Sequence, residues 1–106
     1  MPATVIYSSA AIKELEQSSD WYENHLKDLG KRFVLTIRET LMLASDHPEA
    51  FPKTKAHFRE VVVDGFPFVI VYRYDKKEDI INVLHVFHTS RNPKFKYKRS
   101  FLERKR

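Results

Sequence analysis

Two apolar runs, FREVVV (58–63) and FPFVIVYRY (66–74), flank the dipeptide Asp64-Gly65, and this arrangement constrains the fold more than any other feature of the chain. Both runs are rich in β-branched and aromatic residues, which is typical of strands. Asp-Gly tolerates positive φ and is a strong signal for a two-residue hairpin turn. The pairs that such a turn places opposite each other are Val63 and Phe66, Val61 and Phe68, and Arg59 and Ile70. We therefore expect an antiparallel hairpin that carries Arg59 in the middle of the sheet.

The segments on either side of this hairpin add two more predicted strands. Ala3–Tyr7 (ATVIY) is β-branched and aromatic, and Ile80–Phe87 (IINVLHVF) follows the polar turn sequence DKKED. Short apolar runs bounded by polar turn residues are typical of strands. Pro67 cannot donate a hydrogen bond to a neighbouring strand, so its amide side is expected at an open edge or at the turn.

Two segments between the first strand and the hairpin have the periodicity of amphipathic helices. The residues that recur at steps of three and four in the first segment are Ile12, Leu15, Ser19, Tyr22, Leu26 and Leu29. Ser8 or Ser9 can cap this helix, and Gly30 is predicted to end it in a left-handed conformation. The buried face of the second helix is predicted to consist of Phe33, Ile37, Leu41 and Ala44. Pro48 stops this helix, and the short link between the two helices predicts an antiparallel pair.

The predicted order of elements is β-α-α-β-β-β, which indicates an α+β fold. We expect the N-terminal strand and the helical hairpin to pack on one face of a small antiparallel sheet, which leaves the other face free for function. A chain of 106 residues is long enough for one hydrophobic core but not for two. We assign residues 1–97 to a single domain and residues 98–106 to a basic C-terminal tail.

The positive charge of the chain is concentrated at its C-terminal end. The formal net charge is +5, and residues 94–106 contain seven Lys or Arg and one Glu. A basic tail on a nearly neutral body is typical of proteins that bind nucleic acid or an acidic protein; the alternative is a solvated terminus with no task. The chain has no cysteine, no apolar run of roughly 18 residues and no signal-peptide pattern, so we expect a cytoplasmic protein with no membrane partner.

Arg59, His88 and Arg91 are the first candidates for chemistry. A guanidinium on an apolar strand needs a partner or a purpose, because burying it unpaired is costly. Arg59 therefore forms a salt bridge, faces solvent or binds a ligand. His88 could act as a general acid or base, and Arg91 could hold a phosphate through two parallel hydrogen bonds. The alternative is a turn after the last strand, in which His88 bonds to the backbone.

Lysines and a tyrosine complete a set that is suited to cleaving a phosphodiester without a metal. Such cleavage requires cations around the phosphate and a proton donor for the leaving group. Lys53 and Lys55 precede the strand of Arg59, and Tyr97 lies among the basic residues after it. The other cations expected to contact RNA are Lys94, Lys96, Lys98 and Arg99. We find no metal-ligand spacing, phosphate-binding glycine loop or nucleophilic Ser or Cys motif, so we expect no metal or other cofactor.

Four stretches of the chain, taken in order, resemble the RelE/ParE superfamily of toxins from bacterial type II toxin–antitoxin modules. They are SSAAIKELEQSSDWY, LGKRFVLTIRETL, PEAFP with FREVVVDGFPFVIVYRY, and INVLHVFHTSRNP. The resemblance covers residues 3–97, which is nearly the whole chain. It implies the fold described above and a role in plasmid stabilisation. It also implies that an antitoxin neutralises the protein by wrapping its C-terminal segment around it.

The branches of this superfamily differ in mechanism. RelE-like members cut mRNA in the ribosomal A site, whereas ParE-like members poison DNA gyrase and cut nothing. Our first hypothesis is a ribosome-dependent mRNA endoribonuclease, in which the resemblance implies that Arg59 and Arg91 contact the scissile phosphate while His88 or Tyr97 moves protons. The alternatives are a gyrase inhibitor and an inert member that only binds its antitoxin. The basic tail favours RNA, whereas the placement of the lysines and the tyrosine favours gyrase.

Overall fold

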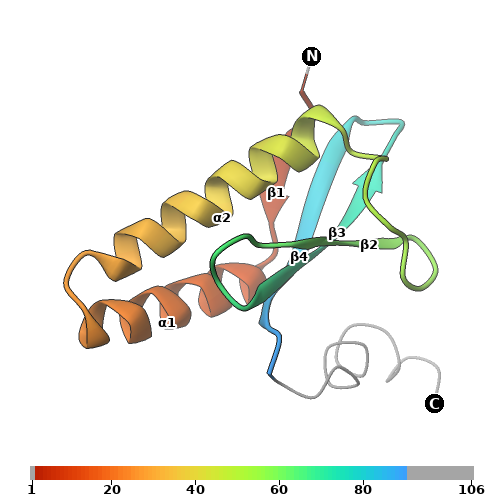
Figure 1. Cartoon of the computed structure of the whole chain (residues 1–106). Coiled ribbons are helices and arrows are strands. Elements are labelled where there is room, and N and C mark those ends of the chain that lie inside the picture. The colour runs from red at the N-terminus through yellow and green to blue at the C-terminus, as the bar shows by residue number, and fades with distance from the viewer. Residues whose placement is uncertain (1, 91–106) are drawn as a thin grey trace.

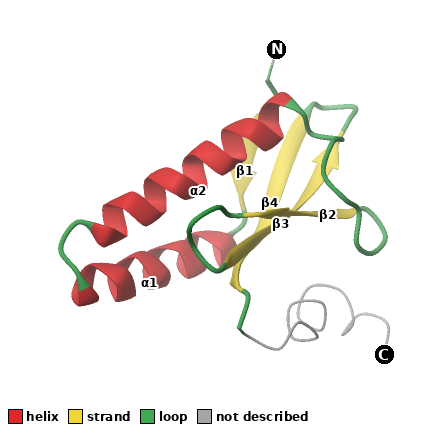
Figure 2. Ribbon diagram, viewed as in Figure 1, coloured by secondary structure: helices red, strands yellow, loops and turns green. Residues whose placement is uncertain are grey.

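The computed structural model describes residues 2–90 and has the predicted order of elements (Figure 1). These elements are β1 (Thr4–Tyr7), α1 (Ser9–His25), α2 (Leu29–Asp46), β2 (Phe58–Val62), β3 (Phe68–Asp75) and β4 (Ile80–His88). The two helices form an antiparallel pair that lies against one face of the sheet (Figure 2). The α+β architecture predicted from the sequence is therefore confirmed. Within residues 2–90, no helix is long and apolar enough to cross a bilayer.

The four strands are arranged in the order β1-β4-β3-β2. β2 pairs with β3, and β3 with β4, in the expected antiparallel directions. β1 differs, because it pairs with β4 in parallel, with Thr4 opposite Ile80. The sheet is thus mixed rather than wholly antiparallel. The residue pattern of a short apolar strand indicates its faces but carries no information about the direction of its partner.

The hairpin between β2 and β3 has a longer turn than the sequence predicts. Arg59 lies opposite Tyr72 rather than opposite Ile70. The chain leaves the ladder at Phe66, whose ring packs against the rings of Tyr22 and Phe33 with centroid distances of 5.2 Å to each. Pro67 follows and has no N–H to donate. Packing of Phe66 on the helices therefore adds residues to the turn and shifts the predicted register.

The link between the helices also differs from the prediction in its use of glycine. The residue with left-handed backbone is Asp28 (φ 70°), and Gly30 lies inside the first turn of α2. A Cβ atom at Gly30 would stand 2.5 Å from the backbone oxygen of Ser19. The glycine is therefore needed for the close approach of α2 to α1. The carboxylate of Glu23 accepts hydrogen bonds from the N–H groups of Asp28 (2.9 Å) and Gly30 (3.0 Å) at this junction.

The hydrophobic core lies between α2 and the sheet. The predicted face of α2 is confirmed, since Phe33, Ile37, Leu41 and Ala44 are all buried. The predicted face of α1 is only partly correct: Leu15 and Tyr22 pack against the core, whereas Ile12 and Leu26 are exposed. The predicted capping of α1 is confirmed, because the Ser8 hydroxyl oxygen accepts a hydrogen bond from the Ala11 N–H at 3.0 Å.

Candidate functional site

Arg59 is directed toward the helix-bearing side of the sheet, and its guanidinium is used inside the fold. Residues opposite each other on paired strands share a face, so Arg59 shares the face of Tyr72, which is fully buried. Its Nη1 donates to the carbonyl oxygens of Phe51 at 2.7 Å and Glu49 at 3.2 Å. Arg59 therefore fastens the loop that follows α2 to the edge of the sheet.

Tyr72 strengthens the same attachment. Its hydroxyl donates to the carbonyl oxygen of Pro48 at 2.8 Å. Burial raises the pKa of Tyr72 to about 12, although the positive charge of Arg59 acts in the opposite direction. The phenol is thus held in its neutral, donating form. Arg59 and Tyr72 together donate to three backbone carbonyl oxygens of this loop, those of Pro48, Glu49 and Phe51, which makes the region a structural clamp.

Lys53 and Lys55 lie beside this clamp at the outer edge of β2. Lys53 forms an isolated antiparallel bridge with Arg59. The Thr54 N–H donates to the Phe58 oxygen at 2.9 Å, so the loop folds back along the strand. Both lysine side chains are exposed. The backbone of Lys53 therefore pairs with that of Arg59, while the Lys53 side chain is exposed.

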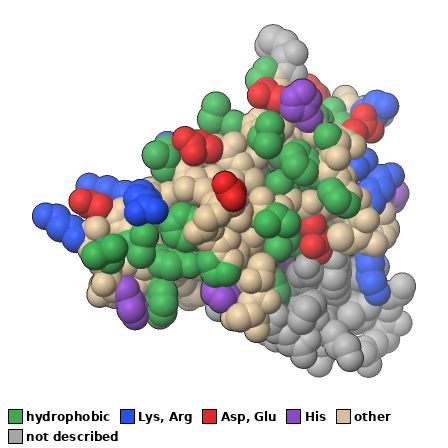
Figure 3. All heavy atoms as spheres, viewed as in Figure 1, with side chains coloured by type: hydrophobic (Ala, Val, Ile, Leu, Met, Phe, Trp, Pro, Cys, Tyr) green, Lys and Arg blue, Asp and Glu red, His purple; other side chains and the backbone are tan. Residues whose placement is uncertain are grey.

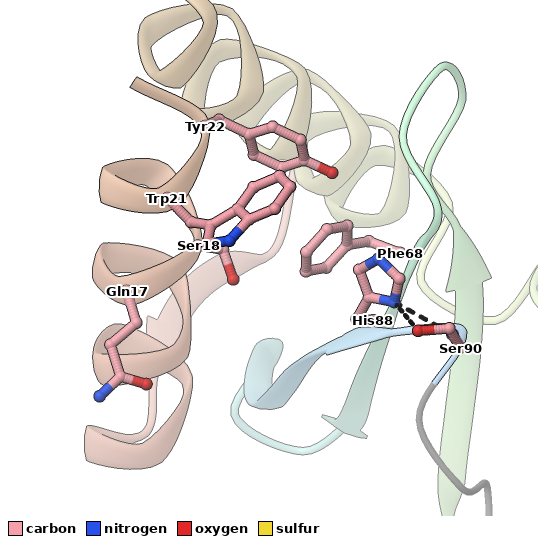
Figure 4. A pocket seen from close by; sticks show the side chains of 7 residues that line it. All are labelled: Gln17, Ser18, Trp21, Tyr22, Phe68, His88 and Ser90. Atoms are coloured by element: carbon pink, nitrogen blue, oxygen red, sulfur yellow. Dashed lines mark hydrogen bonds between the residues drawn. The ribbon is translucent and has the colours of Figure 1, made fainter. Parts of the chain in front are cut away.

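His88 lies at the end of β4 and faces Phe68, with ring centroids 5.1 Å apart in an edge-to-face arrangement. Its Nδ1 accepts a hydrogen bond from the Ser90 N–H at 3.0 Å and lies 2.7 Å from the Ser90 hydroxyl (Figure 4). An imidazole nitrogen that accepts from an N–H carries a lone pair, so the ring proton belongs on Nε2. Nε2 is then a donor, and the basic lone pair is already engaged by Ser90.

The structure keeps Arg59 and His88 apart. Arg59 is opposite Tyr72 and His88 is opposite Phe68, so the two positions differ by four residues along β3. They also lie on the two strands that flank β3. Strand rise and spacing place their Cα atoms roughly 16 Å apart. In this structure the Arg59 guanidinium bonds to the loop after α2 and the His88 ring bonds to Ser90, so the two side chains do not converge on one site.

A pocket of about 330 Å³ opens between α1 and the ends of β3 and β4 (Figure 4). Its helical wall consists of Gln17, Ser18, Trp21 and Tyr22. Phe68, His88 and Ser90 form the sheet wall. Trp21 is 56% exposed, and its indole stacks on the ring of His25 with centroids 3.9 Å apart. The pocket therefore has aromatic walls that remain accessible to a partner.

Trp21 is a candidate that the sequence reasoning missed. It is the single tryptophan of the chain and lies next to Tyr22, outside the apolar face of its helix. An indole on the polar face of an amphipathic helix is a signal for an interaction surface, because tryptophan is enriched at such surfaces. The partner wall on β3 and β4 could not be found from the sequence, since it depends on how α1 crosses the sheet.

His85 is buried within β4. Its Nδ1 lies 3.1 Å from the carboxylate of Glu14 on α1. The same carboxylate accepts a hydrogen bond from the Val86 N–H at 2.9 Å. Because β1 ends at Tyr7, Glu14 takes over the edge of β4 that β1 no longer covers. This pair is a structural contact between the first helix and the sheet.

Charge is unevenly distributed over the face shown in Figure 3. Lys and Arg side chains gather at the tip of the helical hairpin and along the edge on the β2 side, while the surface between them carries hydrophobic side chains interspersed with Asp and Glu. Among residues 2–90, no three His, Asp or Glu side chains are grouped to hold a metal ion. The remaining candidates, Arg91, Lys94, Lys96, Tyr97, Lys98 and Arg99, lie outside the described residues.

Comparison with known proteins gives one family match and several structural matches. The family model for the ParE toxin of the type II toxin–antitoxin system parDE matches residues 5–93. No curated protein matches the chain.

Among solved structures, a chain of the chromosomal ParDE system from P. aeruginosa is 16% identical, with a TM-score of 0.67, and the match covers 83% of this chain and 97% of that one. The isolated E. coli RelE toxin is 14% identical, with a TM-score of 0.63 and coverage of 98% and 99%. The RelBE2 complex of Mycobacterium tuberculosis contains a chain that is 17% identical, with a TM-score of 0.59 and coverage of 83% and 99%. At these identities the likeness shows a shared fold.

Proposed function

This chain belongs to the ParE toxin family of type II toxin–antitoxin systems, and we propose that it inhibits DNA gyrase by binding to it, without cutting a nucleic acid. As the toxin of such a module it has a cognate antitoxin as its partner. We propose that residues 91–106, which contain eight Lys or Arg and one Glu, form the segment that contacts the target. Both gyrase and the ribosome are cytoplasmic, and we place the protein there.

The observation that carries this proposal is the use of Arg59 inside the fold. A nuclease of the kind first considered needs a guanidinium at the scissile phosphate. Here the Arg59 guanidinium bonds to the carbonyl oxygens of Phe51 and Glu49. Turning it toward a substrate would remove both bonds and weaken the attachment of the loop after α2. Because the Arg59 guanidinium is engaged in holding this loop, it is not directed at a substrate. This favours a toxin that acts by binding rather than by catalysis.

The hydrogen bonding of the His88 ring supports the same proposal. A general base needs a free lone pair directed at the substrate. The Nδ1 lone pair of His88 accepts from the Ser90 N–H, and its Nε2 carries the proton. Protonating Nδ1 to make a general acid would break the bond from Ser90. His88 therefore serves better as a hydrogen-bond donor than as a proton-transfer group.

The second candidate is a ribosome-dependent mRNA endoribonuclease, which the cations after residue 90 favour. In that mechanism Arg91 would bind the phosphate and Tyr97 would supply the proton, while Lys94, Lys96, Lys98 and Arg99 would grip RNA phosphates. Arg59, His88, Lys53 and Lys55 would complete the site only if the bonds described above rearranged on the ribosome.

A pair of charge-reversal variants tests the proposal. The target variant carries Lys94→Glu, Lys96→Glu and Lys98→Glu. Its matched control carries Lys13→Glu, Lys27→Glu and Lys77→Glu, which reverse the same number of exposed lysines on the body of the domain. We expect the wild type and the control to inhibit supercoiling by purified gyrase. The target variant should need about tenfold more protein, because several favourable charge contacts become repulsive.

The competing mechanism is measured with the same proteins. Purified ribosomes translating a defined mRNA are incubated with the toxin, and the 3′ ends of the mRNA are mapped. We expect uncut mRNA. Cuts in the A site that disappear in an Arg91→Ala variant, together with unimpaired gyrase, would overturn the gyrase proposal and establish the nuclease.

A further inference from the structure

We propose that the outer groove of the helical hairpin binds a second copy of this chain, so that the α1–α2 hairpins of two protomers pack as a four-helix dimer. The outer groove runs between the helices, with Glu16 and Asp20 on its α1 rim and Lys31, Leu35 and Arg38 on its α2 rim. In the dimer, α2 of each protomer lies in the outer groove of the other. The inference goes beyond the proposed function and depends on neither gyrase nor the antitoxin.

The outer groove lies on the side of the hairpin that faces away from the core. Phe33 of α2 is fully buried, whereas Leu35, which is turned about 200° from it on a helix, is 52% exposed. Two adjoining hollows of about 660 and 480 Å³ make up the groove, and both are lined by Ser19, Asp20 and Val34. The tip of the hairpin projects beyond the sheet (Figure 1), so a second hairpin can approach the groove.

The α2 helix offers an apolar anchor, and the groove offers an apolar floor. Leu35 and Met42 are two helical turns apart on the exposed side of α2, and they are 52% and 61% exposed. Leu15 and Val34 line the groove and are partly buried against the core. A helix that enters the groove of an antiparallel pair packs its ridge of side chains there, as helices do in four-helix bundles. Leu35 of the second copy then covers Leu15 and Val34, and burying this apolar area stabilises the dimer.

The charges on the two rims are complementary between copies. Glu16 and Asp20 give the α1 rim negative charge, and Lys31 and Arg38 give the α2 rim positive charge. All four side chains are exposed. Within residues 2–90, neither Glu16 nor Asp20 forms an ion pair. When α2 of a second copy enters the groove, its two cations come beside these two carboxylates, and the same contacts recur at the symmetry-related site.

Contacts within one protomer leave both rims available. Lys31 Nζ lies 3.8 Å from the carboxylate of Asp28, but both side chains are exposed, and exposed ion pairs of this kind contribute little. Glu23 also lines the groove, but its carboxylate accepts hydrogen bonds from the N–H groups of Asp28 and Gly30. Glu23 is therefore used inside the protomer, and the acidic rim consists of Glu16 and Asp20.

The presence of one acidic and one basic rim favours a second copy over another partner. A partner of one sign would be attracted by one rim and repelled by the other. A second copy carries both rows on one surface, so a two-fold axis pairs each acidic row with a basic one. The competing occupant is the cognate antitoxin, which binding measurements distinguish from a second copy.

Sedimentation velocity of the isolated toxin measures the association directly. We expect the average mass to rise from that of one chain to that of two as the protein concentration increases. The dissociation constant should be on the order of tens of micromolar, as for small transient interfaces. Raising the salt concentration should weaken the dimer, because the charged rims are exposed to solvent. A single chain at every concentration would refute the proposal.

A matched pair of leucine variants on α2 locates the interface. Leu35→Ala removes the anchor, and Leu43→Ala is the control, because Leu43 lies on the same helix, is also 52% exposed and does not line the groove. We expect Leu35→Ala to raise the dimer dissociation constant about tenfold or more and Leu43→Ala to change it less than about twofold. Equal dissociation constants in the two variants would place the contact elsewhere and overturn the proposal.

A pair of charge-reversed chains tests whether the rims meet between copies rather than within one. The first chain carries Glu16→Lys and Asp20→Lys, and the second carries Lys31→Glu and Arg38→Glu. We expect each folded variant, verified by circular dichroism, to be monomeric alone, because both of its rims then have the same sign. An equimolar mixture should form a heterodimer, since each positive rim now meets a negative one, and Leu35→Ala in both chains should weaken it about tenfold. A mixture that stays monomeric would contradict the proposal.

Calorimetry with the cognate antitoxin distinguishes the competing occupant. We expect Leu35→Ala and Leu43→Ala to bind the antitoxin with affinities that differ less than about twofold. A wild type that stays monomeric, together with antitoxin binding that is weakened only in Leu35→Ala, would assign the groove to the antitoxin and overturn the dimer. None of these measurements uses gyrase or the ribosome, so the dimer can fail while the proposed function stands, and the reverse also holds.

Discussion

The two ends of the helix-bearing face of the sheet use their polar side chains in opposite ways. Near the β2 edge, Arg59 and Tyr72 direct their polar atoms inward to backbone carbonyls of the loop after α2. At the far end of β4, His88 and Trp21 line a pocket, and Trp21 is more than half exposed. A charged residue in the sheet is thus used for stability, while aromatic residues outside the core are available for recognition.

This contrast changes which residues are good functional candidates. Arg59 was a functional candidate because a guanidinium in the middle of an apolar strand needs a hydrogen-bonding or charged partner. Its partners in the structure are two carbonyl oxygens of the loop after α2, and a guanidinium can donate to more than one acceptor at once. The pocket could not be predicted from the sequence, because its two walls are more than forty residues apart in the chain.

The largest expected effect breaks the clamp at Arg59. Arg59→Ala should lower the free energy of unfolding by about 2–3 kcal/mol, because charge-assisted hydrogen bonds to two carbonyl groups are lost. Arg73→Ala, which removes an exposed arginine from the neighbouring strand, should change stability by less than about 0.5 kcal/mol. Urea unfolding followed by circular dichroism measures both. Equal, small effects would mean that Arg59 is not a structural residue and would restore it as a candidate for phosphate binding.

A smaller effect is expected from Tyr72→Phe, which removes only the hydroxyl that donates to Pro48. The loss should be about 1 kcal/mol at neutral pH, as for a typical hydrogen bond that is partly buried. The wild-type advantage should then depend on pH. The folded protein raises the pKa of Tyr72 above its ordinary value of 10.0, to about 12, so it favours the neutral phenol. The advantage is complete below pH 10 and shrinks between pH 10 and 12, where the unfolded phenol ionises first.

Urea unfolding of the wild type and Tyr72→Phe at pH 8, 10 and 11.5 measures this dependence. Comparing the two proteins at each pH removes the contribution of Tyr74, whose pKa is also raised to about 12 by its hydrogen bond to Asp79 and which both proteins share. A stability difference that stays constant over this range would contradict the inward-facing, neutral phenol.

The smallest effect on stability is expected at the other end of the sheet. Trp21→Ala removes an indole that contacts His25 and Tyr22 but is more than half exposed, so the loss should be about 0.5 kcal/mol. Thermal or urea unfolding checks this value. A loss above about 2 kcal/mol would show that Trp21 belongs to the core and would remove the basis of the comparison.

Several features of the fold could be predicted from particular residues. The apolar period of Phe33, Ile37, Leu41 and Ala44 identified the buried face of α2, because a helix that faces a sheet must repeat its apolar residues every three or four positions. Ser8 identified the start of α1 through its short hydroxyl side chain. The strands followed from their β-branched and aromatic runs. Each of these signals is local, so a single sequence displays it.

Other features were predicted wrongly because they depend on contacts between distant segments. The register of the hairpin shifted because Phe66 packs on Tyr22 and Phe33 instead of continuing the strand. Gly30 was read as a helix terminator, whereas it allows the close approach of Ser19 on the other helix. Phe66 was read as an ordinary strand residue and Gly30 as a special one, and the role of each depends on a contact across the fold.

The sequence by itself determined the order of the elements, the α+β class and the membership in a toxin family, because periodicity, capping residues and motif order are all written along the chain. Only the tertiary structure decided that Arg59 faces the loop after α2, that His88 lies roughly 16 Å from it, and that Trp21 and Phe68 form one pocket. Those outcomes depend on which strand pairs with which and on how α1 crosses the sheet. Burial and hydrogen bonding set these through contacts between segments that are far apart in the chain.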